Sequence, residues 1–512
     1  MKDKRFQMAR NSDSMFNSLE LPRMGCTGIR LGRNFPREHC QKPTDEQLWS
    51  PNPRLVSEKF MARKDGGFIP ATTLNLLAAA WIQFQTYDWF NHELDLEDQP
   101  YYIPLPPGHS WQGKITLPKT KLDNILDPSD VKCSGYKNIN SASTEEATHE
   151  LRGLDPDGKL ELAENSTGAF IPRDKDSNPR TGFNDNWWVS MEILHTLFAL
   201  EHNILCNIFR KVYPNWTGDQ IFNIARLVNY ALIAKIHTWG LTGERLTKIV
   251  GRISKRSEII SGIPGSGVYH DGIPFSLTEE FVSVYRIHSL IPDNIAFFEA
   301  KHGKYQTITP LEDLTFKNAQ KPLESGISFA DLFYSFGINY PGAITNNNYP
   351  NFLRDLHTPD GLYRDIGTVD IVCNRERGIP RYCAFRRILR MKAPKTFEEL
   401  TGGNKELAKQ LSEVYNGDIE LVDTLVGSHS EPLIPGFGFS ETAFHIFIVM
   451  NTETYTKEGF HWVQYTTIKD ILIRYFPELE DTLKNSKNTF TPWAIKSESK
   501  NYQGIETNAK KT

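Results

Sequence analysis

Tyr285 and His288 are the residues of this 512-residue chain whose types and spacing most directly suggest chemistry. They lie in the segment 275–293, FSLTEEFVSVYRIHSLIPD. Histidine is a common ligand of haem iron, and a tyrosine one helical turn away could exchange electrons with an oxidised haem. The alternative is a tyrosine and a histidine packed in a core with their hydrogen bonds satisfied, which is the more frequent situation for such a pair.

The segment that carries this pair is predicted to be a helix. Ser276 followed by Glu279 three residues later is the signature of a capping box, so the helix should begin there. Pro292 cannot continue it, which gives a helix of about four turns. In such a helix Tyr285 and His288, at positions i and i+3, would share one face.

The composition is that of a globular protein without electrostatic affinity for nucleic acid. The hydrophobic content is 39%, the charged content 23% and the formal net charge −4. The six cysteines form no CxxC pair and no zinc-like spacing, so disulfides are not expected. The N-terminal residues lack the apolar region of a secretory signal, and no apolar run approaches the ~20 residues of a spanning helix. We therefore expect an intracellular monomer that is soluble or attached peripherally to a membrane.

The chain is predicted to form one mainly α-helical domain over residues 71–496. Residues 1–70 are polar and irregular in pattern, and we expect an arm that packs on the core. The polar tail 497–512 is expected to have no fixed structure, and residues 98–179 are expected to be loops. Apolar residues at 3.6-residue spacing predict helices at 72–92 (capped by Thr72 or Thr73), 184–212, 219–250, 397–415, 440–450 and 468–476.

Three segments carry a more specific signal, namely LHTLFALEHN at 194–203, ARLVNYALIAKIHTWGLTGE at 225–244 and VYRIHSLIPD at 284–293. The order and the amino-acid sequences of these segments resemble the peroxidase–cyclooxygenase (animal haem peroxidase) superfamily, and most closely its fatty-acid α-dioxygenase branch. The stretches GRNFPREH, PATTLNLLAAAWIQFQTYDWFNH, NRERGIPRY and IPGFGFSETAFHIFI extend the resemblance over roughly residues 25–495. It implies a helical domain like those of the haem peroxidases and cyclooxygenases.

The resemblance also implies a haem b-dependent oxidoreductase that is activated by peroxide and adds O2 to a fatty acid or a related lipid. His288 would be the proximal iron ligand. Tyr285 would become the tyrosyl radical that removes a hydrogen from the α-carbon, after which O2 adds to give a 2-hydroperoxy fatty acid. His237 and Thr242 match positions that help to hold the substrate carboxylate. Gln83 matches a glutamine on the distal side of the haem.

Two departures from the family pattern concern the two faces of the haem. The distal histidine of the family falls on Tyr87, and a phenol with a pKa near 10 is a poor general base at neutral pH. The asparagine that accepts the N–H of the proximal histidine falls on Cys383. Because sulfur is a weak acceptor, we expect His288 to be oriented less firmly.

Two further departures are gaps in the chain. The family's calcium loop is missing after Thr144, and Asp88 alone cannot supply the six to eight oxygens that calcium needs, so no calcium site is expected. The segment with the arginine that pairs with the fatty-acid carboxylate is missing after Met450. Each gap is either a real divergence or an artefact of the gene model.

Three functions therefore stay open at the level of the sequence. The first is a fatty-acid α-dioxygenase that works through Tyr285. The second is a haem peroxidase that acts on another substrate. The third is a haem-binding relative with impaired or no dioxygenase activity. The role of Tyr87 and the chain length of the substrate are open as well.

Overall fold

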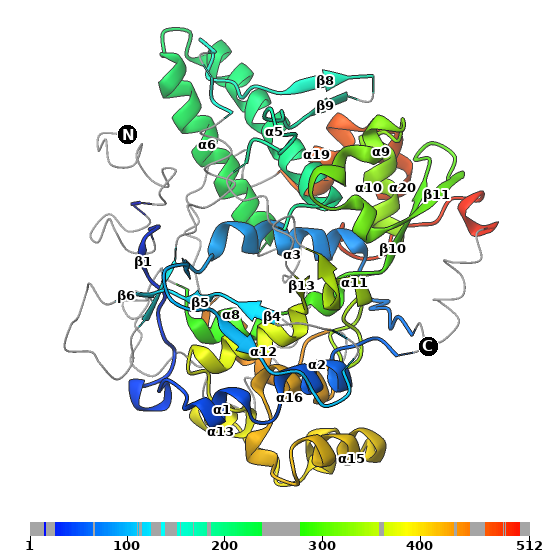
Figure 1. Ribbon diagram of the computed structural model, residues 1–512. Coiled ribbons are helices and arrows are strands. Elements are labelled where there is room, and N and C mark those ends of the chain that lie inside the picture. The colour runs from blue at the N-terminus through cyan, green and yellow to red at the C-terminus, as the bar shows by residue number, and fades with distance from the viewer. Residues whose placement is uncertain are drawn as a thin grey trace.

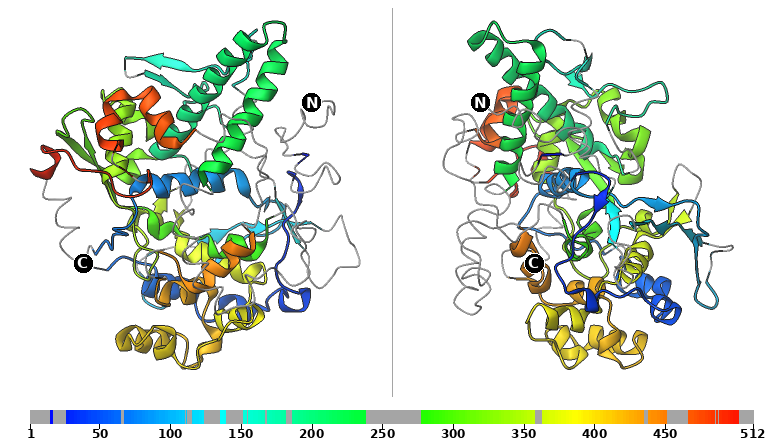
Figure 2. Two further views of the ribbon diagram at one scale, coloured as in Figure 1. Left: turned by 180° about the vertical axis from the view of Figure 1, so that it is seen from behind. Right: turned by 90° about the vertical axis from the view of Figure 1, so that its left-hand side faces the viewer.

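Helices dominate the fold, and one of them, α3 (Leu76–Trp89), crosses the middle of the molecule (Figure 1). On one side of it lie α5 (Val189–Val212), α6 (Gly218–Lys235) and α10 (Phe329–Ile338). On the other side lie α8 (Glu279–Val284), α12 (Ile366–Glu376) and α16 (Thr424–Ser430), and the views in Figure 2 show the same division. The prediction of a mainly α-helical protein is confirmed.

The computed structural model describes residues 15–16, 26–64, 67–109, 111, 115–123, 135–138, 151–153, 155–166, 168–181, 186–237, 277–357, 363–434, 438–450, 466–484, 486 and 488–501. The other helices of these ranges are α1 (Asp45–Trp49), α2 (Pro53–Phe60), α9 (Lys321–Glu324), α11 (Asn351–Arg354), α13 (Tyr382–Ile388), α14 (Phe397–Leu400), α15 (Lys405–Val414), α17 (Glu441–Met450), α19 (Ile468–Tyr475) and α20 (Glu480–Leu483). None of the helices in these ranges has both the length and the apolar character that crossing a membrane requires.

Short antiparallel strand pairs form in segments that the sequence predicted to be loops. Strands within residues 98–179 take part in the pairs β3–β4, β6–β7, β8–β9 and β2–β5. The strand β1 also pairs with β7, which gives a three-stranded sheet in the order β1-β7-β6. The strands are β1 (Ile29–Arg30), β2 (Leu94–Asp95), β3 (Tyr101–Ile103), β4 (Ile115–Leu117), β5 (Lys119–Thr120), β6 (Leu122–Asp123), β7 (Gly135–Asn138), β8 (Ala163–Asn165), β9 (Gly168–Phe170), β10 (Asn294–Phe298), β11 (Tyr305–Pro310), β12 (Leu356–His357) and β13 (Tyr363–Arg364).

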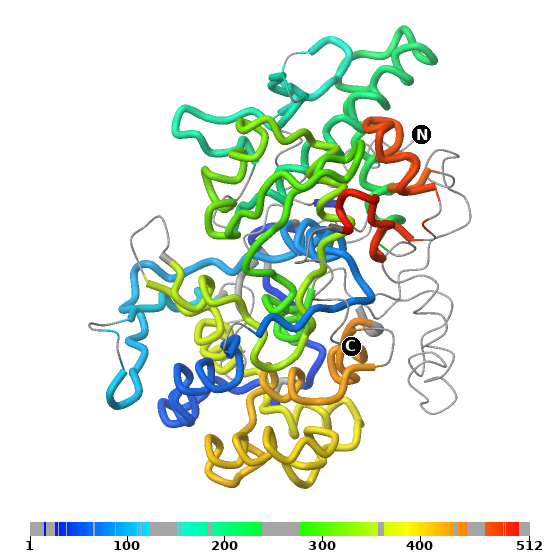
Figure 3. The backbone as a smooth tube through the Cα atoms, turned by 90° about the vertical axis from the view of Figure 1, so that its right-hand side faces the viewer, coloured from blue at the N-terminus to red at the C-terminus, as the bar shows by residue number. Residues whose placement is uncertain are grey.

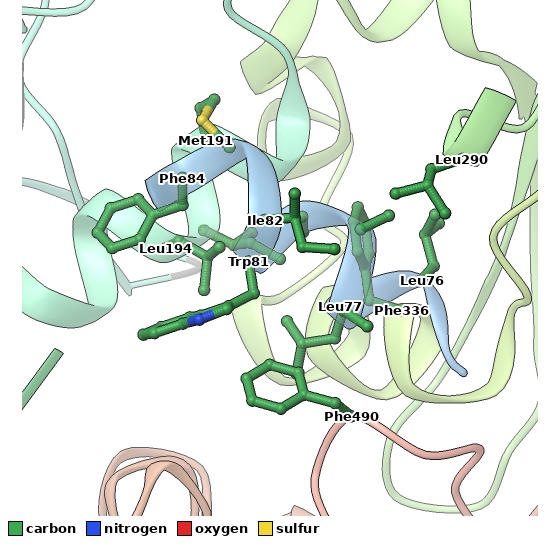
Figure 4. Packing of buried hydrophobic residues seen from close by; sticks show 14 of the residues in the cluster. Leu76, Leu77, Trp81, Ile82, Phe84, Met191, Leu194, Leu290, Phe336 and Phe490 are labelled. Carbon is green, nitrogen blue, oxygen red and sulfur yellow. The ribbon is translucent and has the colours of Figure 1, made fainter. Parts of the chain in front are cut away.

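The central position of α3 follows from its sequence, which is apolar nearly all round. Trp81 and Phe84 are fully buried and pack on Phe198 of α5, with ring centroids 5.7 and 5.5 Å away. Figure 4 shows α3 side chains among Met191 and Leu194 of α5, together with Phe336 and Phe490. Burying each large apolar side chain stabilises the fold by roughly 1.5–3 kcal/mol. The helix α3 is therefore held firmly in the core, and so are the residues that it carries to the candidate site.

Several predicted boundaries are wrong because the capping residues differ from those expected. The helix α3 begins after Asn75, whose side chain accepts a hydrogen bond from the Ala78 N–H, and not after Thr72 or Thr73. The helix α5 begins at Val189 and not at residue 184. The segment 397–415 holds two helices, α14 and α15, with Thr401 between them. Residues 238–250 of the predicted third helix lie outside the described residues.

The two ends of the described chain contact the core. In the N-terminal arm, Arg33 pairs with Glu280 of α8 at 2.9 Å. Near the other end, Ser499 is buried and donates a hydrogen bond to the Gly303 carbonyl at 2.6 Å. Residues 499–501, at the start of the predicted unstructured tail, form a 3-10 turn, and residues 502–512 lie outside the described residues. Figure 3 shows this C-terminal segment in red beside the β10–β11 hairpin.

Candidate active site

The segment that carries Tyr285 and His288 is shorter as a helix than predicted. α8 is capped by Thr278, whose hydroxyl accepts a hydrogen bond from the Phe281 N–H, and it ends at Val284. Ser276 lies outside the described residues. Tyr285 is the C-cap, and a separate 3-10 turn covers His288–Leu290. The prediction of a four-turn helix that ends at Pro292 is therefore wrong, and the pair does not share a helical face.

The break in the helix has a physical cause in the residues that follow it. Arg286 and His288, two positions apart, both direct their side chains to Asp370 of α12, at 3.5 and 2.9 Å. Residues two apart in a continuous α-helix point about 200° from each other, so a continuous helix could not make both contacts. The turn after Tyr285 thus sends His288 to α12.

Asp370 is the hydrogen-bond partner of the predicted iron ligand. Its Oδ2 accepts from His288 Nδ1 at 2.9 Å and from the Tyr349 hydroxyl at 3.2 Å. Burial alone would raise the pKa of Asp370, but the charges of His288 and Arg286 and the two hydrogen bonds lower it, so the group is a carboxylate at neutral pH. A carboxylate only accepts, so His288 donates from Nδ1, and in the neutral imidazole Nε2 is then the nitrogen that carries the lone pair.

Close packing fixes the backbone around His288. Gly342 donates its N–H to the Leu290 carbonyl at 3.0 Å, and a Cβ added at position 342 would lie 1.9 Å from the Ser289 carbonyl oxygen. Only glycine allows this approach. The His288 side chain itself is a third exposed (33%), although Ser289 and Asp370 beside it are buried.

Tyr285 points into an aromatic cluster on the other side of the turn. Its ring stacks on Phe281 at 4.5 Å, contacts Phe447 of α17 edge-on at 4.9 Å and lies 5.8 Å from Trp89 at the end of α3. Burial raises the pKa of Tyr285, which keeps the phenol protonated. Among the described residues its hydroxyl has no hydrogen-bond partner.

His237 joins this cluster through Trp89. The two rings meet edge-on with centroids 5.4 Å apart. Burial lowers the pKa of His237 to about 4, so its imidazole is neutral near pH 7. The Nδ1 atom of His237 is buried and has no hydrogen-bond partner among the described residues. Thr242, the other predicted carboxylate-binding residue, lies outside the described residues.

Gln83 and Tyr87 face the start of α5. Gln83 accepts a hydrogen bond from Trp188 Nε1 at 2.6 Å and donates one to the Asn186 carbonyl at 3.1 Å. The Tyr87 ring is buried and lies 5.7 Å from His195, edge-on. These contacts differ from those of Trp89, two residues further along α3, which points to Tyr285.

Cys383 is not the partner of His288. It lies on α13 and is fully buried, and its Sγ atom faces the Pro394 and Ile419 carbonyls at 3.8 and 3.7 Å. The side chain that contacts His288 is that of Asp370 and not that of Cys383, and we did not predict Asp370 as a site residue. A signal was present, because Asp370 is the only charged residue in the otherwise uncharged run 366–374.

The two gaps of the sequence cannot be followed in the structure. Residues 139–150 and 451–465 lie outside the described residues, as does the side chain of Asp88. Within the described ranges no three His, Cys, Asp or Glu side chains come together as a metal site would require. The absence of calcium therefore stays a prediction.

The residues around His288 fit a haem iron. A neutral imidazole held through Nδ1–H by a carboxylate is the arrangement in which histidines bind metals through Nε2. Here Asp370 fixes that tautomer, the ring is accessible, and Nε2 has no hydrogen bond among the described residues. His288 could therefore bind haem iron through Nε2, with Tyr285 three residues earlier at the end of α8.

Comparisons with known proteins identify the family to which the chain belongs. The family model "Animal haem peroxidase" matches residues 9–488. Alpha-dioxygenase 2 of Arabidopsis thaliana is 32% identical over 560 aligned positions, which cover 96% of this chain and 85% of that protein. The crystal structure of an Arabidopsis thaliana fatty acid alpha-dioxygenase superposes with a TM-score of 0.80 and 30% identity, covering 95% of this chain and 83% of that one. An Oryza sativa fatty acid alpha-dioxygenase variant crystallised with palmitic acid gives a TM-score of 0.82 at 28% identity, covering 96% and 88%.

The mainly helical fold and the match to the animal haem peroxidase family define the class of the protein as a haem-dependent oxidoreductase. The chain belongs to the animal haem peroxidase family, and the relative and the two solved structures named above are alpha-dioxygenases. The resemblance stated from the sequence is thus confirmed.

Proposed function

We propose that this protein is a fatty-acid α-dioxygenase that binds haem b through His288 and uses Tyr285 to remove a hydrogen atom from the α-carbon. The observation that carries the proposal is the divergence of these two side chains at one turn. His288 points to Asp370 at 2.9 Å, whereas Tyr285 points to Trp89 and the aromatic cluster. The named fatty acid alpha-dioxygenases from Arabidopsis and rice support the choice of substrate.

The haem, once activated by peroxide, supplies the one-electron oxidation that no amino-acid side chain provides by itself. The protein's part begins at Tyr285. Loss of an electron and the phenolic proton from Tyr285 leaves a phenoxyl radical, which accepts a hydrogen atom from C2 of the fatty acid and becomes a phenol again. O2 then adds to the carbon radical at C2. The peroxyl radical takes a hydrogen atom from the Tyr285 phenol, which gives the 2-hydroperoxy acid and regenerates the phenoxyl radical.

The carboxylate end of the fatty acid would meet His237. As a neutral imidazole, His237 can donate one N–H to the carboxylate, and Nδ1 has no other partner among the described residues. Thr242 is the second group that we propose for this end. The hydrocarbon chain would lie against apolar side chains next to Tyr285, such as Phe281 and Phe447.

A second candidate function rests on Tyr87. A phenol in the place of the family's distal histidine is a weak base at neutral pH, which would slow activation by peroxide. In that case the protein would bind haem at His288 and either oxygenate fatty acids poorly or oxidise another substrate as a peroxidase.

Oxygen uptake by the haem-loaded protein with palmitate or a C18 fatty acid tests the proposal, with the product identified by mass spectrometry. We expect uptake and a 2-hydroperoxy acid for the wild type, and loss of both in Tyr285→Phe. Tyr213→Phe, at an exposed position, is the matched control and should behave as the wild type. No uptake by the wild type, or unchanged uptake by Tyr285→Phe, would overturn the proposal. A peroxidase would still oxidise a phenolic dye in Tyr285→Phe.

A further inference from the structure

Trp89 contacts both of the groups that the proposed reaction needs. Its indole lies 5.4 Å from the His237 ring and 5.8 Å from the Tyr285 ring, measured between ring centroids. One side chain thus contacts both the residue proposed to hold the carboxylate and the residue proposed to remove the hydrogen.

The chemistry of a fatty acid sets how far apart those two residues can be. The carboxylate carbon and the α-carbon are joined by a bond of ~1.5 Å. A carboxylate oxygen sits ~2.8 Å from a donor nitrogen, and a hydrogen-abstracting oxygen sits ~3–3.5 Å from the carbon it attacks. His237 and Tyr285 both lie against one indole, so an acid bound at His237 would reach Tyr285 along this ring. The β-carbon would reach Tyr285 only if the acid moved by one methylene toward His237.

The atoms that would take the substrate are available in the structure. The Nδ1 atom of His237 is buried and has no hydrogen-bond partner among the described residues. A buried polar atom without a partner costs free energy, and a bound carboxylate would remove that cost. The Tyr285 hydroxyl likewise has no partner in the described part of the chain, so it can meet a C–H group instead of a competing acceptor.

The indole is held so that it can act as a fixed wall. It is the last residue of α3, whose Trp81 and Phe84 side chains are fully buried, and it lies 5.7 Å from Phe281, which stacks on Tyr285. A bulky aromatic side chain with few rotatable bonds excludes alternative positions of a flexible chain better than an aliphatic one.

We propose that Trp89 is the specificity-determining residue that makes C2, and not C3, the carbon presented to Tyr285, by separating the carboxylate at His237 from the phenol by a fixed distance. This inference rests on the proposed function. It adds a role for a side chain that reacts with nothing itself. The substrate class is an unbranched long-chain fatty acid with a free carboxylate.

The first test measures where the oxygen is inserted. Haem-loaded wild type is expected to give the 2-hydroperoxide of palmitate, and Trp89→Phe should raise the ratio of 3- to 2-hydroperoxide. Discrimination of one methylene in an apolar site is typically about tenfold or more, and that is the change we expect in this ratio. Trp216→Phe, remote in the α5–α6 connection, is the matched control and should keep the wild-type ratio. An unchanged ratio in an active Trp89→Phe variant would overturn the inference.

The second test does not depend on turnover. A palmitate analogue with a photoreactive diazirine at C3 is bound to the haem-loaded protein and irradiated, and the labelled peptide is identified. We expect the label on Trp89 in the wild type and its loss in Trp89→Phe, with circular dichroism showing that the variant is folded. If the wild type takes up no oxygen but Trp89 is labelled, the dioxygenase proposal fails, whereas the inference that Trp89 lies beside C3 of the bound acid is supported. If Trp89 is not labelled while the acid binds, the inference fails.

Discussion

His288 and Asp370 are joined by a hydrogen bond of 2.9 Å that links the turn after α8 to the middle of α12. The two residues are 82 positions apart in the chain. Their contact sets the tautomer of His288 and places a buried negative charge behind the nitrogen proposed to bind iron. The electronic character of the proximal ligand is therefore decided by α12 as well as by the segment that carries the histidine.

Asp370→Asn tests this relationship. The amide keeps the size of the side chain and a hydrogen-bond acceptor, but it removes the negative charge that makes His288 a stronger electron donor. We expect haem to stay bound, the reduction potential of the iron to rise, and activity to fall by about 10–100-fold, as is common for residues behind metal ligands. Spectroelectrochemistry of the haem-loaded variant measures the potential. Asp313→Asn, at an exposed position, should leave it unchanged; an unchanged potential in Asp370→Asn would contradict the role given to Asp370.

Gly342→Ala tests the packing that holds the His288 turn. A Cβ at this position would meet the Ser289 carbonyl oxygen at 1.9 Å, so the backbone next to His288 must move. We expect a loss of about 1–3 kcal/mol in the free energy of unfolding, as for other overpacked sites, together with weaker haem binding. Urea unfolding and haem titration measure the two effects.

Gly108→Ala provides the control for this prediction. Gly108 has a φ of +76° but open space around its Cβ position, so alanine there strains the backbone without a clash. It should lower stability and leave haem affinity as in the wild type. Equal haem affinity in Gly342→Ala and the wild type would show that the turn tolerates displacement.

Tyr87→His tests whether the phenol at position 87 slows activation by peroxide. An imidazole with a pKa near 6.5 accepts a proton at neutral pH far better than a phenol does, and general bases contribute about 10²–10⁴-fold to rates. We expect peroxide to react at least about 10²-fold faster with the haem-loaded variant, measured by stopped-flow absorbance. Tyr102→His, at an exposed position, should have no effect. A rate equal to that of the wild type would mean that position 87 does not serve the haem.

The lowered pKa of His195 predicts how the free energy of unfolding depends on pH. Its ring is buried, and burial lowers its pKa to about 4 although the hydrogen bond from Nδ1 to the Met191 carbonyl opposes the shift. Between pH 6.5 and about 4 the unfolded chain binds a proton at this residue and the folded protein does not. The free energy of unfolding should therefore fall with falling pH in this window, by about 1.4 kcal/mol per pH unit for each such histidine.

The matched pair for this prediction is His195→Gln and His302→Gln. Urea unfolding at several pH values should give a shallower pH dependence for His195→Gln, because one proton is removed from the difference between the two states. His302 is exposed, so His302→Gln should keep the wild-type slope. The same slope for both variants would show that His195 does not contribute.

Much of the helical framework could be predicted from periodicity. The bounds of helices α3 and α5 lie within five residues of those expected, and the bounds of α17 and α19 within one, because their apolar faces are regular. Short strands such as β10–β11 escaped prediction, since pairs of three to six residues depend on tertiary contacts and not on a long pattern.

The candidate site was predicted in part. The types and spacing of Tyr285 and His288 identified the residues, but a local pattern could not show that the helix breaks between them. That break depends on Asp370, which is distant in sequence. Cys383 was assigned by its place in a motif, and the structure shows that α13 turns its sulfur to the Pro394 carbonyl instead.

The central claim, that Tyr285 removes the hydrogen from the α-carbon of a fatty acid, is tested most directly by deuterium substitution in the substrate. Oxygen uptake by haem-loaded wild type is compared for palmitate, palmitate deuterated at C2 and palmitate deuterated at C3. We predict slower uptake with the C2-deuterated acid alone, and retention of one deuterium in the 2-hydroperoxide. Equal rates with all three acids and a product that keeps both deuterium atoms would contradict the account.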